Sequence, residues 1–327
     1  MEKNELNKNA RGGSELMQER LYRDLPADLL EKFQIILSRV RDVSSDKRKI
    51  LWLHDLPNDP ESQHLKEASS RQRFNKIVCV SNWQMQLYNL ILGVPYQDCM
   101  VIKNAIEPID IDVKEYDGTV RLIYHTTPHR GLEILVPVFE ELCNIFDNIH
   151  LDVYSSFSVY GWEQRDEQYK ALFDRCRAHP KITYHGGVSN QEVREALKKS
   201  HIYAYPCIWP ETSCISVVEA MSAKNLVVCP NFAALPETCA NFAMMYPWNE
   251  NPNAHAVLFA NTLDNAIRTI IKNKGSTDPY LDFQKQYFDY FYNWEIRKGE
   301  WLALLSALAD AEPAQPQNND TLIYRTS

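Results

Sequence analysis

Two glutamates, Glu211 and Glu219, stand eight positions apart around the segment of the chain best suited to chemistry. A strand-like run, residues 203–206, precedes them and leads into a proline-bounded turn. Thr212 and Ser213 predict the N-cap of an apolar-faced helix, because their short side chains accept hydrogen bonds from its first N–H groups. This pattern predicts Glu211 in the loop before the helix and Glu219 about two turns inside it.

The start of this predicted helix is suited to bind a phosphate group. The first N–H groups of a helix have no partner within it, and the helix dipole adds a partial positive charge there. A diphosphate placed at Cys214 and Ile215 would leave Glu211 near one end of the ligand and Glu219 near the other. The segment therefore indicates a diphosphate ligand with a carboxylate at each end.

The same segment resembles the donor-site signature of retaining glycosyltransferases of the GT-B fold, especially glycosyltransferase family 4. That signature is a glutamate, seven further residues and a Glu-Ala pair, here Glu211 and Glu219-Ala220, with a Tyr-Pro pair before it. The resemblance implies that Glu211 acts in catalysis by contacting hydroxyls of the donor sugar, and that Glu219 binds the ribose of the nucleotide. The residues between them would line the donor site: Thr212, Ser213, Cys214 and Ile215.

A glycine pair near the N-terminus, Gly12 and Gly13, resembles the family loop that closes over the donor's phosphates. Glycines there let the backbone approach a ligand, because no Cβ stands in the way. Taken alone, such a pair before a helix is more often a structural turn. Family members normally have an apolar strand before this loop, and residues 1–10 contain none.

His54 ends a predicted strand and resembles the family position where a histidine faces the transferring sugar. The resemblance makes His54 a catalytic candidate, whereas a lone histidine at a strand end is usually structural. Arg130-Gly131 fits the second of two family positions whose cations bind the diphosphate, and arginine suits bidentate phosphate binding. No cationic residue occupies the first of these two positions in this sequence. The hydroxyl of Thr126 or Thr127 could bind the diphosphate in its place.

The composition describes an ordinary globular chain and excludes some classes of function. The chain has 327 residues, enough for two cores, with 45% hydrophobic and 24% charged residues. A net charge of −8 argues against a general nucleic-acid binder. Its eight cysteines form no Cys-x-x-Cys pair and indicate reduced core residues of a cytoplasmic protein. The absence of a signal-peptide pattern and of a long apolar run predicts at most peripheral membrane contact.

Short apolar runs alternate with helix-like stretches on both sides of an acidic linker at 107–118, which predicts an α/β fold. The resemblance makes this a GT-B fold, in which two Rossmann-like domains face a cleft and a C-terminal helix crosses back to a shortened N-terminal domain. We expect residues 1–110 with helix 287–311 to form the acceptor-side domain. Residues 111–286 would form the donor domain, and 312–327 a flexible tail.

These features together predict a retaining glycosyltransferase that moves a sugar from a nucleotide diphosphate sugar to a glycan or glycoconjugate acceptor. We expect no metal, because no Asp-x-Asp stands at a strand end and Asp110-Ile111-Asp112 lies in the linker. No cofactor is expected beyond the donor co-substrate. A non-catalytic nucleotide-sugar-binding subunit of a transferase complex remains the alternative. A nicotinamide-dependent oxidoreductase is disfavoured, because the Gly-x-Gly-x-x-Gly fingerprint is absent.

Overall fold

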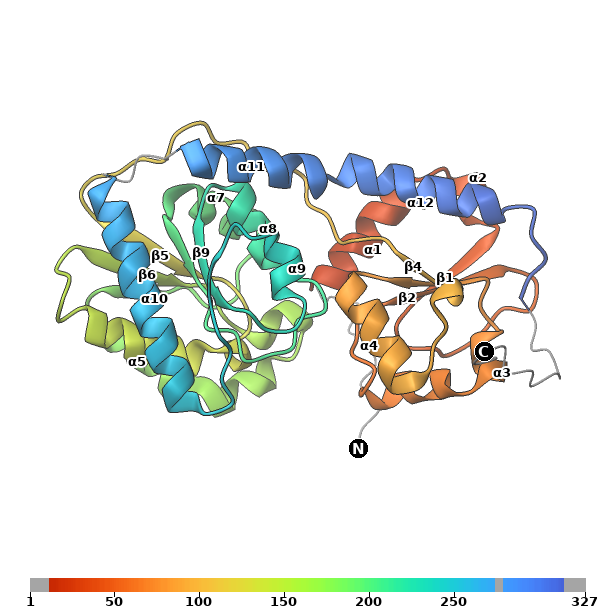
Figure 1. Cartoon of the computed structure of the whole chain (residues 1–327), viewed down its shortest axis with the longest axis horizontal. Helices are drawn as coiled ribbons and strands as arrows, with labels where there is room; N and C mark the ends of the chain where they lie inside the picture. The colour runs from red at the N-terminus through yellow and green to blue at the C-terminus, as the bar shows by residue number, and fades with distance from the viewer. Residues whose placement is uncertain (1–11, 274–278, 315–327) are drawn as a thin grey trace, which may run out of the picture. The chain divides into compact units, whose positions relative to one another are not determined.

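The computed structural model describes residues 12–273 and 279–314, and the chain divides into two compact units. Among the described residues, one unit contains 12–15, 105–273 and 279–293. The other contains Leu16–Asn104 and residues 294–314. Each unit is built on its own parallel sheet, of six strands in the first and four in the second (Figure 1). The predicted α/β class is therefore confirmed, whereas the segment 1–10 and most of the predicted tail lie outside the described residues.

The four-stranded sheet is parallel throughout and has the order β1-β2-β3-β4. Its central strands are almost continuous apolar runs, as expected where helices or loops cover both faces of a parallel sheet. The strands are β1 (Phe33–Leu37), β2 (Arg48–Leu53), β3 (Lys76–Cys79) and β4 (Cys99–Val101).

Helices from both ends of the chain belong to this unit. The last helix returns to it, because the Trp301 ring meets the Trp52 ring edge-on at 4.7 Å and the Trp294 Nε1–H donates to Asp24 Oδ2 at 2.6 Å. Ser81 caps the helix after β3, and Gly93 ends that helix with a φ of 66°. The helices are α1 (Gly13–Asp24), which enters this unit at Leu16, α2 (Ala27–Leu30), η1 (Pro60–Lys66), α3 (Ala68–Arg71), α4 (Asn82–Leu92), η2 (Tyr96–Asp98) and α12 (Trp294–Leu308).

The six-stranded sheet has the order β10-β9-β8-β5-β6-β7 and is also parallel. The chain runs outward from β5 in one direction and then from β8 in the other, so the strand order reverses between β5 and β8. The crevice at the carboxyl ends of such a strand pair is the usual ligand site of an open α/β sheet. The strands are β5 (Val120–Tyr124), β6 (Ile149–Val153), β7 (Ile182–Tyr184), β8 (Ile202–Ala204), β9 (Leu226–Pro230) and β10 (Met244–Tyr246).

Helices connect these strands and bury one large apolar core around them. The helix α7 begins with a capping box, in which Ser189 and Glu192 exchange hydrogen bonds with each other's backbone N–H. The helical segments are η3 (Pro128–Arg130), α5 (Leu132–Leu142), η4 (Phe157–Tyr160), η5 (Glu163–Tyr169), α6 (Lys170–Ala178), α7 (Asn190–Lys199), α8 (Ile215–Ser222), α9 (Leu235–Cys239), α10 (Pro252–Lys272) and α11 (Pro279–Phe291).

Two of the three places where the described chain passes from one unit to the other are paired with each other. Ile106 forms a parallel bridge with Asn293, and the Ile106 N–H donates to the Tyr292 carbonyl at 2.8 Å. Just after this point the chain enters the irregular segment that the sequence predicts as a linker. Both connections therefore reach the six-stranded unit at one anchored position.

All eight cysteines are free thiols, and six of them are buried. Within the described part of the chain, no helix combines the length and apolar character that crossing a bilayer requires.

Candidate functional site

The loops after β5 and β8 touch each other at the point where the strand order reverses. Gly131 has a φ of +127°, and a Cβ at that position would lie 2.1 Å from the Pro206 carbonyl oxygen. The Ile208 N–H donates to the Arg130 carbonyl at 3.4 Å. Glycine is therefore required at position 131 for both its backbone conformation and this close approach, which brings Arg130 beside the second loop.

Arg130 and Glu211 form a buried ion pair between these loops. Arg130 Nη1 donates to Glu211 Oε1, and the Tyr205 hydroxyl donates to the same oxygen at 2.5 Å. Burial lowers the pKa of the Arg130 guanidinium, but Glu211, followed by Tyr160 and Tyr205, outweighs burial and holds that pKa well above its usual value. The sequence predicts Arg130 as a phosphate ligand and gives no sign of this pairing with Glu211.

Of the two neighbouring threonines, Thr127 is the one that contacts Arg130. Its Oγ1 accepts from Arg130 Nε at 3.2 Å, and its carbonyl accepts from the Tyr124 hydroxyl at 2.9 Å. Thr126 is half-buried in the same loop. The threonine hydroxyl that lies beside the Arg130 side chain is therefore that of Thr127, while a role for Thr126 stays a prediction.

The predicted N-cap of α8 is wrong. The helix begins at Ile215, and its N-cap is Cys214, which makes no side-chain capping hydrogen bond, although its Sγ lies 3.1 Å from Ser216 Oγ. Thr212 and Ser213 remain in the loop, where the Ala234 N–H donates to the Glu211 carbonyl at 3.1 Å and holds the chain before the helix. Glu219 is consequently the fifth residue of α8, little more than one turn inside it rather than two.

The glycine pair near the N-terminus lies against this same helix start. A Cβ on Gly13 would lie 2.9 Å from Ile215 Cδ1, and one on Gly12 would lie 2.3 Å from Tyr160 Cε1. Real Cβ atoms do not approach other atoms so closely, so both positions are restricted to glycine unless Tyr160 and Ile215 shift. The structure therefore brings Gly13 and Ile215 into contact and places Gly12 beside them. The sequence predicts all three for the donor site.

Glu219 is buried within α8 and is held by α7. Asn190 Nδ2 donates to both carboxylate oxygens at 3.2 Å, and Arg194 Nη1 donates to Oε1 at 3.2 Å. Neither Asn190 nor Arg194 is among the residues that the sequence predicts for the site. Their i, i+4 spacing places them on one face of α7, but the sequence does not reveal that this face meets Glu219.

Two histidines near the Arg130 loop are neutral. Burial lowers the pKa of His125 to about 3, and its ring packs against Tyr203 at 4.5 Å. Burial, then Arg130 and Arg165, lowers the pKa of His129 to about 4. At neutral pH, neither side chain adds a positive charge beside the ion pair of Arg130.

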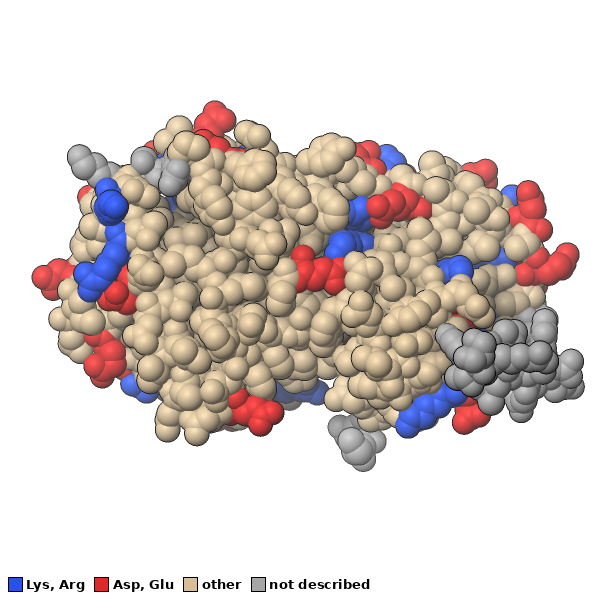
Figure 2. Space-filling view, in the orientation of Figure 1, with Lys and Arg blue, Asp and Glu red and all other residues tan. Residues whose placement is uncertain are grey.

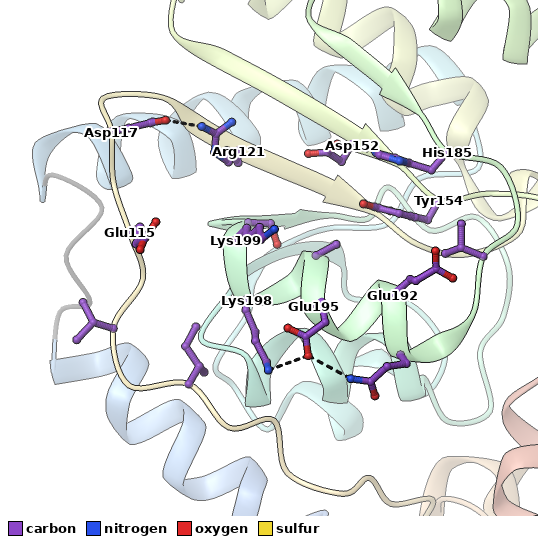
Figure 3. Close-up of a pocket in the computed structure, with 16 residues that line it drawn as sticks. Glu115, Asp117, Arg121, Asp152, Tyr154, His185, Glu192, Glu195, Lys198 and Lys199 are labelled. Atoms are coloured by element: carbon purple, nitrogen blue, oxygen red, sulfur yellow. Dashed lines mark hydrogen bonds and ion pairs between the residues drawn. The ribbon is translucent and has the colours of Figure 1, made fainter.

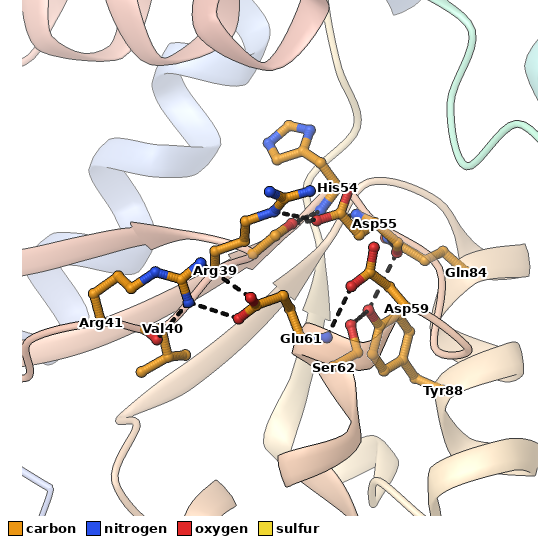
Figure 4. Close-up of polar contacts among 11 residues, drawn as sticks. Arg39, Val40, Arg41, His54, Asp55, Asp59, Glu61, Ser62, Gln84 and Tyr88 are labelled. Atoms are coloured by element: carbon orange, nitrogen blue, oxygen red, sulfur yellow. Dashed lines mark hydrogen bonds and ion pairs between the residues drawn. The ribbon is translucent and has the colours of Figure 1, made fainter. Parts of the chain in front are cut away.

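His54 belongs to the four-stranded unit, where it follows β2 (Figure 4). Its backbone N–H donates to Ser38 Oγ at 2.8 Å, its ring lies 4.8 Å from the Trp52 ring, and burial lowers its pKa to about 3. Beside it lies a polar network that includes the ion pair of Arg41 with Glu61 at 2.6 Å. His54 is thus a neutral, half-buried side chain in a unit that does not contain Glu211, and its catalytic role stays a prediction.

A separate cavity of about 900 Å³ lies on the six-stranded unit between α7, the strands β5 to β7 and the segment 111–117 (Figure 3). In it, His185 stacks on Tyr154 at 4.1 Å and contacts Asp152 Oδ1 through Nε2 at 2.8 Å. None of the predicted donor-site residues lines this cavity. Across the described ranges, no three His, Cys, Asp or Glu side chains are grouped so that they could hold a metal ion.

Comparison with known families and sequences identifies one recurring class of enzyme. Residues 114–276 match the family model described as "Glycosyl transferases group 1". A phosphatidylinositol N-acetylglucosaminyltransferase subunit of Arabidopsis thaliana is 23% identical over 168 residues, which are 50% of this chain and 36% of that protein. The gpi3 subunit of the enzyme of the same name in Schizosaccharomyces pombe is 20% identical over 225 residues, 67% of this chain and 46% of that protein. The matched part of the chain spans less than half the length of these relatives.

Solved structures give a closer match in fold than in sequence. A glycosyltransferase of Rickettsia africae has a TM-score of 0.66 at 15% identity, covering 95% of this chain and 85% of that one. Alr3699/HepE of Anabaena in complex with UDP-glucose has a TM-score of 0.62 at 15% identity, covering 80% and 73%. These likenesses confirm the predicted GT-B fold, and with the family match they support a glycosyltransferase.

Proposed function

We propose that this chain, in which residues 114–276 match a group 1 glycosyl transferase domain within a GT-B fold, is a retaining glycosyltransferase. It would move a sugar from a nucleotide diphosphate sugar to a glycan or glycoconjugate acceptor. One observation carries the proposal: the helix that follows β8, where the strand order reverses, has Gly13 packed against its start and one buried carboxylate before it and one within it. This combination suits a ligand with a doubly charged centre and hydroxyl groups on either side.

The diphosphate would lie at the start of α8. The first N–H groups of the helix point toward it, and the helix dipole favours negative charge there. Gly13 packs directly on Ile215, so its backbone can approach the phosphates without a side chain between them. Arg130 already donates to Glu211 and Thr127, and the remaining N–H groups of its planar guanidinium can bind a phosphate oxygen.

The two carboxylates would bind opposite ends of the donor. Glu219 would accept the ribose hydroxyls, and Glu211 would accept hydroxyls of the sugar. Charge builds on the departing diphosphate and on the sugar ring as the bond to the leaving group breaks. Arg130 donates a hydrogen bond to Glu211. Side by side, Arg130 could stabilise the charge on the diphosphate and Glu211 the charge on the sugar ring. We propose front-face transfer with retention, without a covalent sugar–enzyme intermediate.

The proposed reaction needs no metal ion, because the helix start and Arg130 supply positive charge to the diphosphate. We further propose a cytoplasmic location, in agreement with the eight free thiols. Nucleic acid is not an expected partner, since basic and acidic side chains are interspersed on the face drawn in Figure 2 and the net charge is −8. The relatives' names suggest UDP-N-acetylglucosamine as the first donor and phosphatidylinositol as the first acceptor to be tried.

The alternative is a nucleotide-sugar-binding subunit without its own activity. The names of the relatives describe them as subunits, which makes this the second candidate function. Incubation of the purified chain with UDP-N-acetylglucosamine or UDP-glucose, with and without acceptor and EDTA, separates the two. Released UDP that disappears in Glu211→Gln supports the enzyme. Binding of the donor without any turnover supports the non-catalytic alternative, and a β-linked product from an α-linked donor contradicts retention.

A further inference from the structure

We infer that Arg194 is a positioning residue that fixes Glu219 for a nucleoside diphosphate and joins it to the connection entering the six-stranded unit. This inference rests on the proposed function for the identity of the ligand, but its geometry is independent of that proposal. Arg194 Nη1 donates to Glu219 Oε1 at 3.2 Å. Its Nη2 donates to the carbonyls of Glu107 at 2.9 Å and Pro108 at 3.2 Å.

The shape of the guanidinium group makes these contacts interdependent. Its nitrogens are held in one plane at fixed angles, so the group cannot turn toward Glu219 without moving its hydrogen bonds to the backbone. The Arg194 side chain is 13% exposed and has little room to adopt another rotamer. A shift at the carboxylate is therefore transmitted to residues 107 and 108, and the reverse also holds.

Arg194 also supplies the positive charge that pairs with the buried Glu219 carboxylate. The Glu219 side chain is only 4% exposed, and a buried carboxylate is stable when paired and hydrogen-bonded. Asn190 contacts both oxygens but carries no charge. A carboxylate offers about four acceptor positions. Contacts from described residues use two on Oε1 and one on Oε2, which leaves Oε2 as the oxygen for a ribose hydroxyl.

The connection itself is held by its carbonyl groups. Glu107 and Pro108 accept from Arg194, and the next carbonyl, Ile109, accepts from Lys285 Nζ at 2.5 Å. The Ile109 N–H donates to Ser222 Oγ at 2.9 Å. Arg194, one of the cations that hold carbonyls of this stretch, is the partner of Glu219. A ribose that orders Glu219 should therefore reduce local opening of residues 105–112, and loss of Arg194 should remove that effect.

The test uses the full chain, UDP as the probe, and the variants Arg194→Met and Arg194→Lys. The matched control is Arg175→Met, which removes an arginine of the same unit from an exposed pair with Glu140. Calorimetry compares UDP with 2′-deoxy-UDP, and hydrogen exchange follows residues 105–112 with and without UDP. We expect Arg194→Met to weaken UDP at least tenfold and to lose the preference over 2′-deoxy-UDP. Arg175→Met should behave as wild type.

Arg194→Lys restores a charge but not the planar fork, so it separates positioning from neutralisation. We expect it to recover part of the UDP affinity without the UDP-dependent protection of 105–112. If Arg194→Met fails to fold, the double variant Arg194→Met/Glu219→Gln removes the uncompensated charge. In that variant, UDP should give no protection of 105–112.

The possible results differ for the inference and for the proposed function. Wild-type affinity and ribose preference in Arg194→Met would overturn the inference while leaving the proposed function intact, as would a lack of UDP-dependent protection in the wild type. UDP-dependent protection of 105–112 in the double variant would overturn it equally. Failure of UDP, GDP and ADP to bind the wild-type chain would contradict the proposed function and the inference together.

Discussion

The carboxyl edges of the two parallel sheets differ in how deeply their ion pairs are buried. At the six-stranded sheet, Glu211 and Glu219 are buried and paired with Arg130 and Arg194. At the four-stranded sheet the Arg41–Glu61 pair is open to solvent, with side chains 55% and 40% exposed, and the Arg39 and Asp55 side chains are 24% and 33% exposed.

A buried pair carries a desolvation cost that an exposed pair largely avoids. The six-stranded edge therefore keeps its charges in fixed positions at some cost in stability, as a preorganised binding site requires. The four-stranded edge gains no such rigidity from its charges.

The largest effect should follow from breaking the buried pair of Arg130. Arg130→Met leaves the Glu211 charge without its partner, and such a loss typically costs about 3–5 kcal/mol in the free energy of unfolding. We expect urea denaturation to show a loss in that range. The double variant Arg130→Met/Glu211→Gln should recover most of it, because no charge then remains buried. A loss of less than about 1 kcal/mol in the free energy of unfolding of the single variant is the usual value for an exposed pair. It would show that the two sheet edges do not differ in how strongly they depend on their ion pairs.

The second prediction divides the two buried carboxylates by role. Hydrogen bonds to a charged group are worth about 1.5–3 kcal/mol each, so Glu219→Ala should weaken nucleoside diphosphate binding tenfold or more. Glu211→Ala should leave that affinity almost unchanged while kcat collapses, since sugar positioning matters mainly in the transition state. Calorimetry and turnover measurements on both variants decide it. Equal losses of affinity would show that the donor lies elsewhere along α8.

The third prediction concerns a property that the two edges share. His54 and His125 both have a pKa lowered to about 3 by burial, against 6.5 when exposed. Between these values the unfolded chain binds more protons than the folded one, so stability falls as pH decreases from about 6.5 toward 3. Each histidine contributes up to about 1.4 kcal/mol per pH unit in that window. Urea unfolding from pH 7 to 4 should show a shallower slope in His54→Gln and in His125→Gln, and an unchanged slope would contradict the burial of either ring.

The smallest effect should come from the exposed edge. Arg41→Met and Glu61→Gln should each change the free energy of unfolding by about 0–1 kcal/mol. The change should shrink further in high salt, because screening weakens exposed pairs. Denaturation in low and high salt provides the measurement. A loss as large as that of Arg130→Met would mean that this network is as rigid as the buried one.

The sequence predicts much of this architecture because its signals are local. Alternating apolar runs predict parallel strands, and the spacing of Glu211 and Glu219 around a helix start survives in the structure. The predicted N-cap is wrong, since α8 begins at Ile215, and the loop before it is held by a backbone contact from Ala234 to Glu211. Such a contact joins residues that are distant along the chain, so local capping preferences cannot reveal it.

The partners of Glu211 and Glu219 could not be predicted from the sequence either, because these contacts also depend on how elements pack. Arg194 and Asn190 are ordinary polar residues on a surface-like face of α7, and only the packing of α7 against α8 brings them to Glu219. Tyr205 is, in the sequence, one residue of a strand-like run. Its hydroxyl reaches Glu211 because both leave the sheet at the same edge.

The contact of Trp301 with Trp52 sets an order of events during synthesis. A ribosome extends the chain at about 5–20 residues per second and releases the N-terminal strands first. Trp52, 1% exposed in the folded protein, has no cover from Trp301 until translation has passed residue 301. The stretch Ala105–Asn293 is continuous and can fold before that moment. The unit whose strands are translated first is therefore the last to be completed, and its exposed tryptophan marks the period in which a nascent chain would most need a chaperone.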